Sequence, residues 1–94
     1  MEHKKTPRNQ EDLKDLKTRL NRISGQVNGV IKMLDENRYC KDILIQISAI
    51  ESALKEVGHL VLKEHLLTCV KDDVINGDDS SLLSSFELAK KLWK

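Results

Sequence analysis

Two series of aliphatic residues, spaced alternately by three and four positions, constrain this chain more than any other feature of its sequence. The first series comprises Leu13, Leu16, Leu20, Ile23, Val27, Val30 and Leu34, and the second comprises Ile43, Ile47, Ile50, Leu54, Val57 and Val61. This heptad spacing places all members of a series on one side of a helix, as in helices that pack along other helices. Each series therefore predicts a long helix.

The ends of these helices can be placed from capping and turn-forming residues. Asn9 or Asp12 can cap the first helix, and the polar stretch at residues 35–38 should end it. We expect the second helix to continue to about Ile75, because Gly77 then supplies the left-handed residue that ends many helices. A short third helix should follow.

A hairpin of two long helices still has a bare apolar face, and a short third helix covers only part of it. We expect a second copy of the chain to complete an antiparallel four-helix-bundle dimer. The predicted fold class is thus all-α, with two long helices and a short third helix in each chain. Residues 1–10, which are polar and hold the only proline, predict a flexible tail. Residues 11–94 are predicted to form a single helical domain.

Composition excludes several classes of protein. Lys and Arg number 16 and Asp and Glu number 15, so the net charge of +1 by itself demands no nucleic-acid or membrane partner. No apolar run approaches the ~18 residues of a membrane span, and no apolar segment follows the charged N-terminus. We expect a cytoplasmic protein without a membrane partner. No Gly-rich phosphate loop or oxyanion-type turn accompanies the two cysteines, so an enzyme is not expected.

One group of residues has the chemistry of a metal site: Cys40, His65 and Cys69. His65 and Cys69 lie four residues apart and so share one face of the predicted helix. Cys40 lies at the start of that helix, ~40 Å away along a straight rod, so only an antiparallel partner could bring it to the other two. Two soft thiolates and one imidazole suit Cu(I), whereas Zn(II) would require a fourth ligand. The alternative is that Cys69 is a small buried hydrophobe and His65 a surface residue.

Basic residues gather on the first predicted helix: Lys14, Lys17, Arg19, Arg22 and Lys32. A solvated helix face explains such a pattern in most proteins. In a symmetric assembly, however, copies of this face would form an extended positive surface able to neutralise phosphates. The sequence has no helix-turn-helix pattern, so any binding of DNA would use another surface.

Four motifs within Arg19–Leu54 and Lys63–Val70, namely RLNRI-x-GQ, YC-x-D, QI-x-A and H-x-x-x-C, resemble the CsoR/RcnR family of bacterial metal-sensing and thiol-sensing repressors. The resemblance covers about two-thirds of the chain. It implies an all-helical protomer, a homodimer that pairs into a homotetramer, and ligand sites created by antiparallel helices. It also implies that operator DNA is bound when no effector is present.

Within that family, the ligand set indicates the effector. Copper sensors resemble this chain in having Cys, His and Cys at the positions of Cys40, His65 and Cys69. Nickel and cobalt sensors have His at the last position and an added N-terminal His, where this chain has Arg8. The function implied is a Cu(I)-responsive repressor released from operator DNA when Cu(I) binds between subunits. The alternatives are a persulfide-sensing repressor with an inter-subunit Cys40–Cys69 thiol switch, and a structural helical bundle with inert cysteines.

The resemblance also suggests supporting residues. Copper sensors join the ligand His to a Tyr, here Tyr39, and to a Glu on the third helix; counting from Gly77, that position is Ser85, with Glu87 two residues on. Tyr39 and Glu87 are therefore the predicted partners of the imidazole. The residues predicted to contact DNA are Lys17, Arg19, Arg22 and Lys55, because Glu51 occupies a position where relatives carry Arg.

Overall fold

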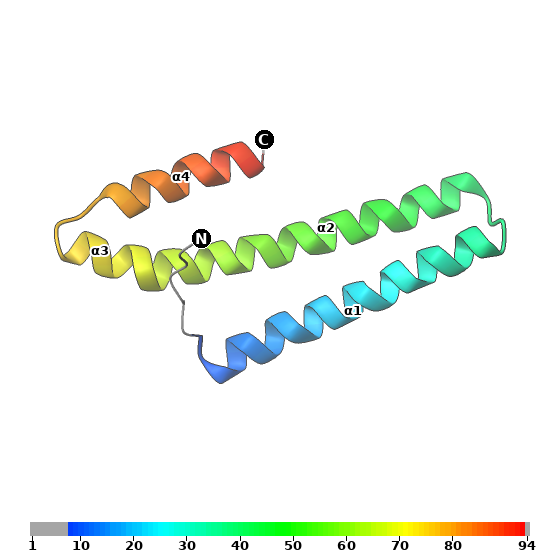
Figure 1. Ribbon diagram of the computed structural model, residues 1–94, viewed down its shortest axis with the longest axis horizontal. Helices are drawn as coiled ribbons and strands as arrows, with labels where there is room; N and C mark the ends of the chain where they lie inside the picture. Colours follow the sequence, from blue (N-terminus) through cyan, green and yellow to red (C-terminus); the bar gives the residue numbers. More distant parts are fainter. Residues whose placement is uncertain (1–7, 94) are drawn as a thin grey trace, which may run out of the picture. The chain divides into compact units, whose positions relative to one another are not determined.

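The computed structural model describes residues 8–93, in which all regular structure is helical (Figure 1). Residues 1–7, most of the predicted tail, lie outside the described residues, and Gln10 is already helical. The elements are α1 (Gln10–Asp35), α2 (Cys40–His65), the π-helix η1 (Leu66–Val70), α3 (Lys71–Ile75) and α4 (Ser80–Leu92). The predicted all-α class, with two long helices and a short last one, is confirmed. The second long helix is the continuous run of α2, η1 and α3.

Contacts divide the described chain into two units, residues 8–59 and residues 60–93. The boundary falls inside α2, so the first unit holds α1 with most of α2 and the second holds η1, α3 and α4. A single domain over residues 11–94 stays a prediction. None of the helices in residues 8–93 is long and apolar enough to cross a membrane.

The start of α1 is fixed by an exchange of hydrogen bonds between Asn9 and Asp12. The backbone N–H of Asp12 donates to Asn9 Oδ1 at 2.7 Å, and Asn9 Nδ2 donates to the Asp12 carboxylate at 2.9 Å. Asn9 is therefore the cap, and Asp12 supports it from the first turn, where a negative charge also interacts favourably with the helix dipole.

Both long helical runs end in the same way. Asn37, with φ of 54°, follows α1, and the N–H of Arg38 donates to the Met33 carbonyl at 2.9 Å. Gly77, with φ of 84°, follows α3, and the N–H of Asp78 reaches back to the Asp73 carbonyl at 2.8 Å. Each is a left-handed residue closing a 6→1 bond, which satisfies carbonyls that a helix end would otherwise leave without partners.

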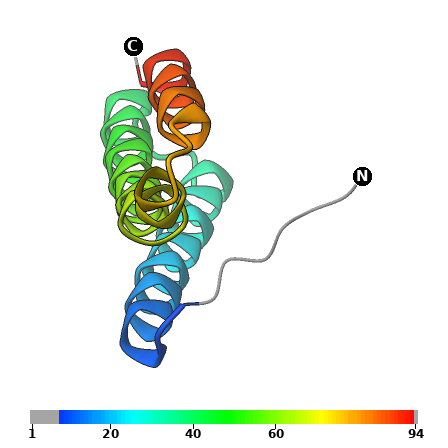
Figure 2. The same ribbon diagram turned by 90° about the vertical axis from the view of Figure 1, so that its left-hand side faces the viewer.

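In the unit of residues 60–93, α4 turns back and packs on η1 and α3 (Figure 2). The turn is held by the carboxylate of Asp78. This group accepts hydrogen bonds from the backbone N–H of Ser80 at 2.9 Å and from the Ser80 hydroxyl at 2.6 Å. Val70, at the end of η1, is 2% exposed and is the most buried of the core side chains. This unit places α4 beside the π-helix.

In the unit of residues 8–59, α1 and the first part of α2 form an antiparallel hairpin (Figure 1). The structure splits each heptad series in two. Leu16, Ile23, Ile43 and Val57 are buried, and Val30 and Ile50, which continue the same seven-residue steps, are half-buried. Of the alternate members, Leu13 is half-buried, and the others in this unit remain exposed: Leu20, Val27, Leu34, Ile47 and Leu54.

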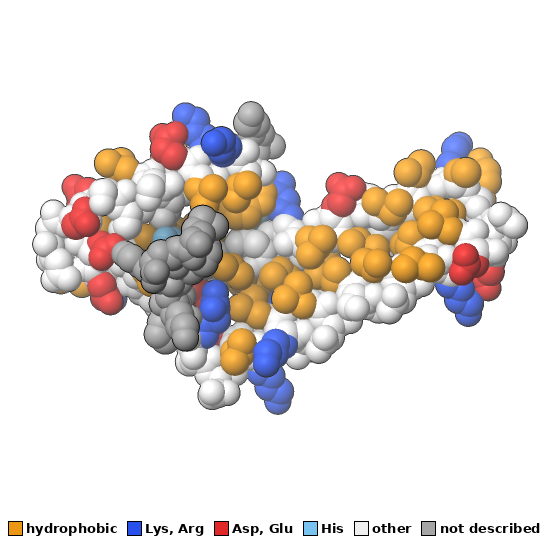
Figure 3. All heavy atoms as spheres, viewed as in Figure 1, with side chains coloured by type: hydrophobic (Ala, Val, Ile, Leu, Met, Phe, Trp, Pro, Cys, Tyr) orange, Lys and Arg blue, Asp and Glu red, His pale blue; other side chains and the backbone are white. Residues whose placement is uncertain are grey.

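This outward set forms an apolar surface on the hairpin, and Figure 3 shows hydrophobic side chains gathered along α1 and α2. One heptad position on each helix faces the protomer's own core, and the other faces outward. Contiguous apolar surface of this kind marks an interaction site more often than a solvated face.

Candidate metal centre

Cys40 is the first residue of α2 and is exposed. The preceding residue, Tyr39, is also exposed, and its carbonyl accepts from the N–H groups of Asp42 and Ile43 at 3.0 and 3.2 Å. The helix therefore begins immediately after Tyr39, which puts both side chains at its N-terminal end. The Cys40 thiol is accessible to another chain.

His65 and Cys69 lie at the other end of the same helical run. His65 is the last residue of α2 and Cys69 lies within η1, and both are half-buried. The hydroxyl of Thr68 donates to the Glu64 carbonyl at 2.7 Å and lies 3.7 Å from Cys69 Sγ. A threonine hydroxyl that bonds four residues back competes with the helical ladder. Such competition is one physical reason for the wider π-helical turn at this point.

The imidazole of His65 contacts α4. Its Nε2 lies 3.1 Å from the hydroxyl oxygen of Ser85. Ser85 is 6% exposed, and it is the single buried polar residue within residues 8–93. With Nε2 held by Ser85, the ring nitrogen left for a metal ion is Nδ1.

The four residues predicted to contact DNA all belong to the unit of residues 8–59. Lys17 and Arg22 on α1 and Lys55 on α2 are exposed. The side chain of Arg19 is 38% exposed, and its Nε donates to the Asp15 carboxylate at 3.1 Å. An exposed pair of this kind is weak, worth roughly 0.2–1 kcal/mol, so phosphate can compete for the guanidinium.

A family model described as metal-sensitive transcriptional repressor matches residues 12–92. The chain belongs to this family of repressors. It is 40% identical over 95 residues to CsoR, the copper-sensing transcriptional repressor of Bacillus subtilis, covering 99% of this chain and 94% of that protein. It is also 49% identical over 59 residues to the copper-sensing repressor RicR of Mycobacterium tuberculosis, covering 63% of this chain and 62% of RicR.

Two solved structures resemble this repressor. Cu(I)-bound CsoR from Geobacillus thermodenitrificans matches with a TM-score of 0.85 and 43% identity, covering 96% of this chain and 95% of that chain. The nickel-responsive regulator InrS matches with a TM-score of 0.74 and 35% identity, covering 92% and 97%. The predicted family is confirmed, and the protein is a transcriptional repressor and not an enzyme.

A single chain of this repressor does not assemble the proposed ligand set. Cys40 and His65 are the first and last residues of α2, and no three metal-ligating side chains cluster anywhere in residues 8–93. The donor chemistry nevertheless fits a soft ion. Both cysteines are thiols and the Nδ1 atom of His65 faces away from its bond to Ser85. The predicted ligand set contains no carboxylate, which favours Cu(I) over harder ions.

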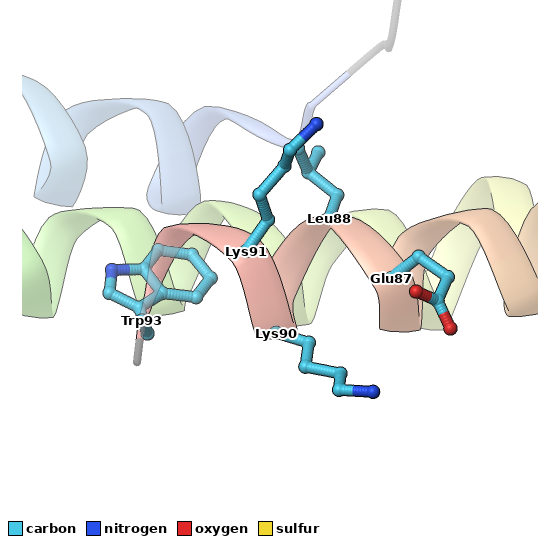
Figure 4. Close-up of a pocket in the computed structure, with 5 residues that line it drawn as sticks. All are labelled: Glu87, Leu88, Lys90, Lys91 and Trp93. Atoms are coloured by element: carbon cyan, nitrogen blue, oxygen red, sulfur yellow. The ribbon is translucent and has the colours of Figure 1, made fainter.

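The partner of His65 within the repressor chain is Ser85, at the position that counting from Gly77 had indicated. Glu87 is exposed and lines a surface pocket with Leu88, Lys90, Lys91 and Trp93 (Figure 4). The roles proposed for Tyr39 and Glu87 stay predictions. Sequence reasoning did not name Ser85 as a partner because a serine carries no strong signal, and its register relative to Gly77 was the only clue.

Proposed function

We propose that this repressor senses Cu(I). Metal-free protein binds its operator in the cytoplasm, and Cu(I) held by Cys40 of one protomer with His65 and Cys69 of the partner subunit releases the DNA. The observation that carries the proposal is the set of two thiols and one imidazole placed at the two ends of one continuous helical run. Its relatives with copper-sensing function support the choice of ion.

The change in DNA binding would come from the way the ligand residues of two protomers are held together. The ion supplies a centre that soft donors from two protomers can ligate together, and ligation therefore links the two chains at that point. A dimer held in this arrangement would present its basic α1 faces differently from the metal-free dimer. By linkage, bound DNA must weaken Cu(I) binding by the same factor by which Cu(I) weakens DNA binding.

A direct test is an anaerobic titration of reduced protein with Cu(I) against a competing chelator, followed by release of a fragment of its own promoter. We expect one tightly bound Cu(I) per protomer, with DNA released as the sites fill. Tight binding that leaves the DNA in place would contradict the proposal.

The assembly that this site requires is a homodimer formed through the outward heptad residues. Leu20, Val27 and Leu54 are each more than 40% exposed in the protomer. Because full burial of an aliphatic side chain contributes roughly 1.5–3 kcal/mol, covering these residues with a second copy would stabilise a dimer. Outside the two series, Leu44 and Ile45 are 62% and 63% exposed, which provides apolar surface for pairing dimers into a homotetramer.

The change Val27→Lys should break this assembly, because it would bury an ammonium group in an apolar interface. We expect its mass in solution, measured by light scattering, to fall toward that of the monomer. Thr18→Lys is the matched control, since Thr18 is exposed on the side of α1 away from the series. An unchanged mass for the Val27 variant would rule out this interface.

Operator binding by metal-free protein should depend on the exposed cations of α1. Arg22→Ala should weaken binding and lower the slope of log affinity against log salt by about one for each lost phosphate contact. Lys90→Ala on α4 removes an exposed cation not assigned to DNA and should leave the slope unchanged. Equal effects of the two variants would mean that binding depends only on overall charge.

A further inference from the structure

Asparagine is followed by glycine at two places in the chain, Asn28–Gly29 and Asn76–Gly77. This dipeptide favours intramolecular deamidation, because a glycine nitrogen approaches the side-chain amide without hindrance from a Cβ. The first pair lies inside α1, and the second lies in the turn after α3. We propose that Asn76–Gly77 is a site of spontaneous covalent modification, at which Asn76 becomes aspartate or isoaspartate, and that this conversion loosens the turn before α4.

The reaction consumes one water molecule and no other reagent. The Gly77 amide loses its proton, and its nitrogen bonds to Cγ of Asn76. The bond from Cγ to Nδ2 breaks, and Nδ2 takes up a proton and leaves as ammonia, which produces a five-membered succinimide. Water then opens the ring. Attack at Cγ gives aspartate, whereas attack at the main-chain carbonyl carbon gives isoaspartate, in which the main chain runs through the former side chain.

The backbone around Asn76 presents only a local obstacle to ring closure. Asn76 and Gly77 are exposed, and a Cβ built on Gly77 would meet no atom within 4 Å. The Gly77 nitrogen can reach Cγ once the peptide between them rotates. This rotation breaks the bond from the Gly77 N–H to the Val74 carbonyl, at 3.0 Å, and strains the bond from Asp78 to Asp73, at 2.8 Å. Both bonds close the end of a helical run, where local opening requires little free energy.

Asn28–Gly29 has the same residue types but a different backbone setting. Both residues are exposed, and a Cβ on Gly29 would also meet no atom within 4 Å, so neither exposure nor space distinguishes the two pairs. Asn28, however, lies more than one turn from either end of α1, which runs from Gln10 to Asp35. Rotation there would break the hydrogen-bond ladder in mid-helix, and re-forming a helix on both sides is cooperative. The fold therefore protects Asn28 and leaves Asn76 reactive.

Conversion at Asn76 would change both the charge and the length of the turn. One new carboxylate lowers the net charge from +1 to 0. It appears at the C-terminal end of α3, where the helix dipole disfavours an anion, and in a segment that already carries Asp72, Asp73, Asp78 and Asp79. Isoaspartate also adds a methylene to the main chain inside the loop that the bond between residues 78 and 73 closes. Both products therefore disfavour the present geometry of the turn that leads into α4.

The first experiment stores the full chain at neutral and at mildly alkaline pH and follows both sites over time. Cleavage at mildly acidic pH, chromatography and mass spectrometry then measure the peptides that contain residues 28 and 76. We expect Asn76 to convert at least about 10-fold faster than Asn28, since the end of a helix opens more readily than its middle. Both rates should rise with pH, because the deprotonated nitrogen is the nucleophile. In strong denaturant the two sites should convert at similar rates.

Equal rates in the folded protein would overturn the proposal, as would an Asn76 that stays intact when folded but converts in denaturant. Hydrogen exchange tests the effect on the turn. The N–H of Leu83, which donates to the Asp79 carbonyl at 3.1 Å, should exchange faster in converted protein than in fresh protein. Asn76→Gln should prevent both changes, because glutamine would have to close a slower six-membered ring, and Asn28→Gln should prevent neither. Unchanged exchange after conversion would show that the turn is not loosened.

Discussion

Protein carrying Cys40→Ser will lose tight Cu(I) binding and will stay on its operator when copper is added. A serine hydroxyl is a poor ligand for a soft ion, so we expect affinity to fall by more than ~100-fold. Cys69→Ser should behave in the same way. Helix content measured by circular dichroism should be unchanged in both variants, because Cys40 is exposed and Cys69 is only half-buried.

The two variants together test whether the site lies between subunits. In a mixed dimer, the chain with Cys69→Ser still has Cys40, and the chain with Cys40→Ser still has His65 and Cys69. These three side chains together form one intact site. Unfolding and refolding an equal mixture should therefore restore about one tight site for every four protomers, given random pairing. If all three ligands came from one chain, the mixture would contain no intact Cu(I) site. If subunit exchange is verified and tight Cu(I) binding still does not return, the inter-subunit arrangement is excluded.

The change His65→Ala will separate copper sensing from sulfur sensing. We expect it to abolish release of DNA by Cu(I), since two thiols alone leave the ion without its third ligand. A repressor switched by a bridge between Cys40 and Cys69 would instead keep its response to polysulfide, because thiolate attack on sulfur needs no imidazole ligand. The exposure of Cys40 is compatible with that chemistry.

His59→Ala is the control for this experiment, because His59 is an exposed histidine of the same helix with no proposed role in the site. The His59→Ala variant should still release DNA when Cu(I) is added. If His65→Ala still releases DNA on addition of Cu(I), His65 is not a ligand and the copper site must be sought elsewhere.

Much of the fold could be predicted from local signals. The heptad series located both long helices, and Gly77 marked the end of the second because a left-handed residue suits glycine. The choice between Asn9 and Asp12 as cap could not be made, since both can accept a backbone N–H and the two residues in fact exchange bonds. Local chemistry sufficed wherever the determining groups were within a few residues of each other.

Other features depend on contacts between distant residues. The same periodicity describes Ile23 and Val27, yet only the structure shows that Ile23 is buried and Val27 exposed. The bond from His65 to Ser85 joins residues twenty positions apart and depends on how closely α4 approaches η1. The π-helical turn was not predicted either, because its sequence, Leu66–Val70, reads as an ordinary helix.

Because of that turn, the proposed ligand site depends on the spacing of residues as well as on their type. In η1 the N–H of Lys71 reaches the Leu66 carbonyl, five residues back, so the segment holds one more residue per turn than its neighbours. Loss of Leu66, Leu67 or Thr68 would let the segment return to α-helical geometry and would leave Cys69 three residues beyond His65 instead of four. The imidazole and the thiol would then no longer have the relative placement that the present spacing gives them. One in-frame codon deletion among these three residues would thus disturb the proposed site with every ligand residue still present.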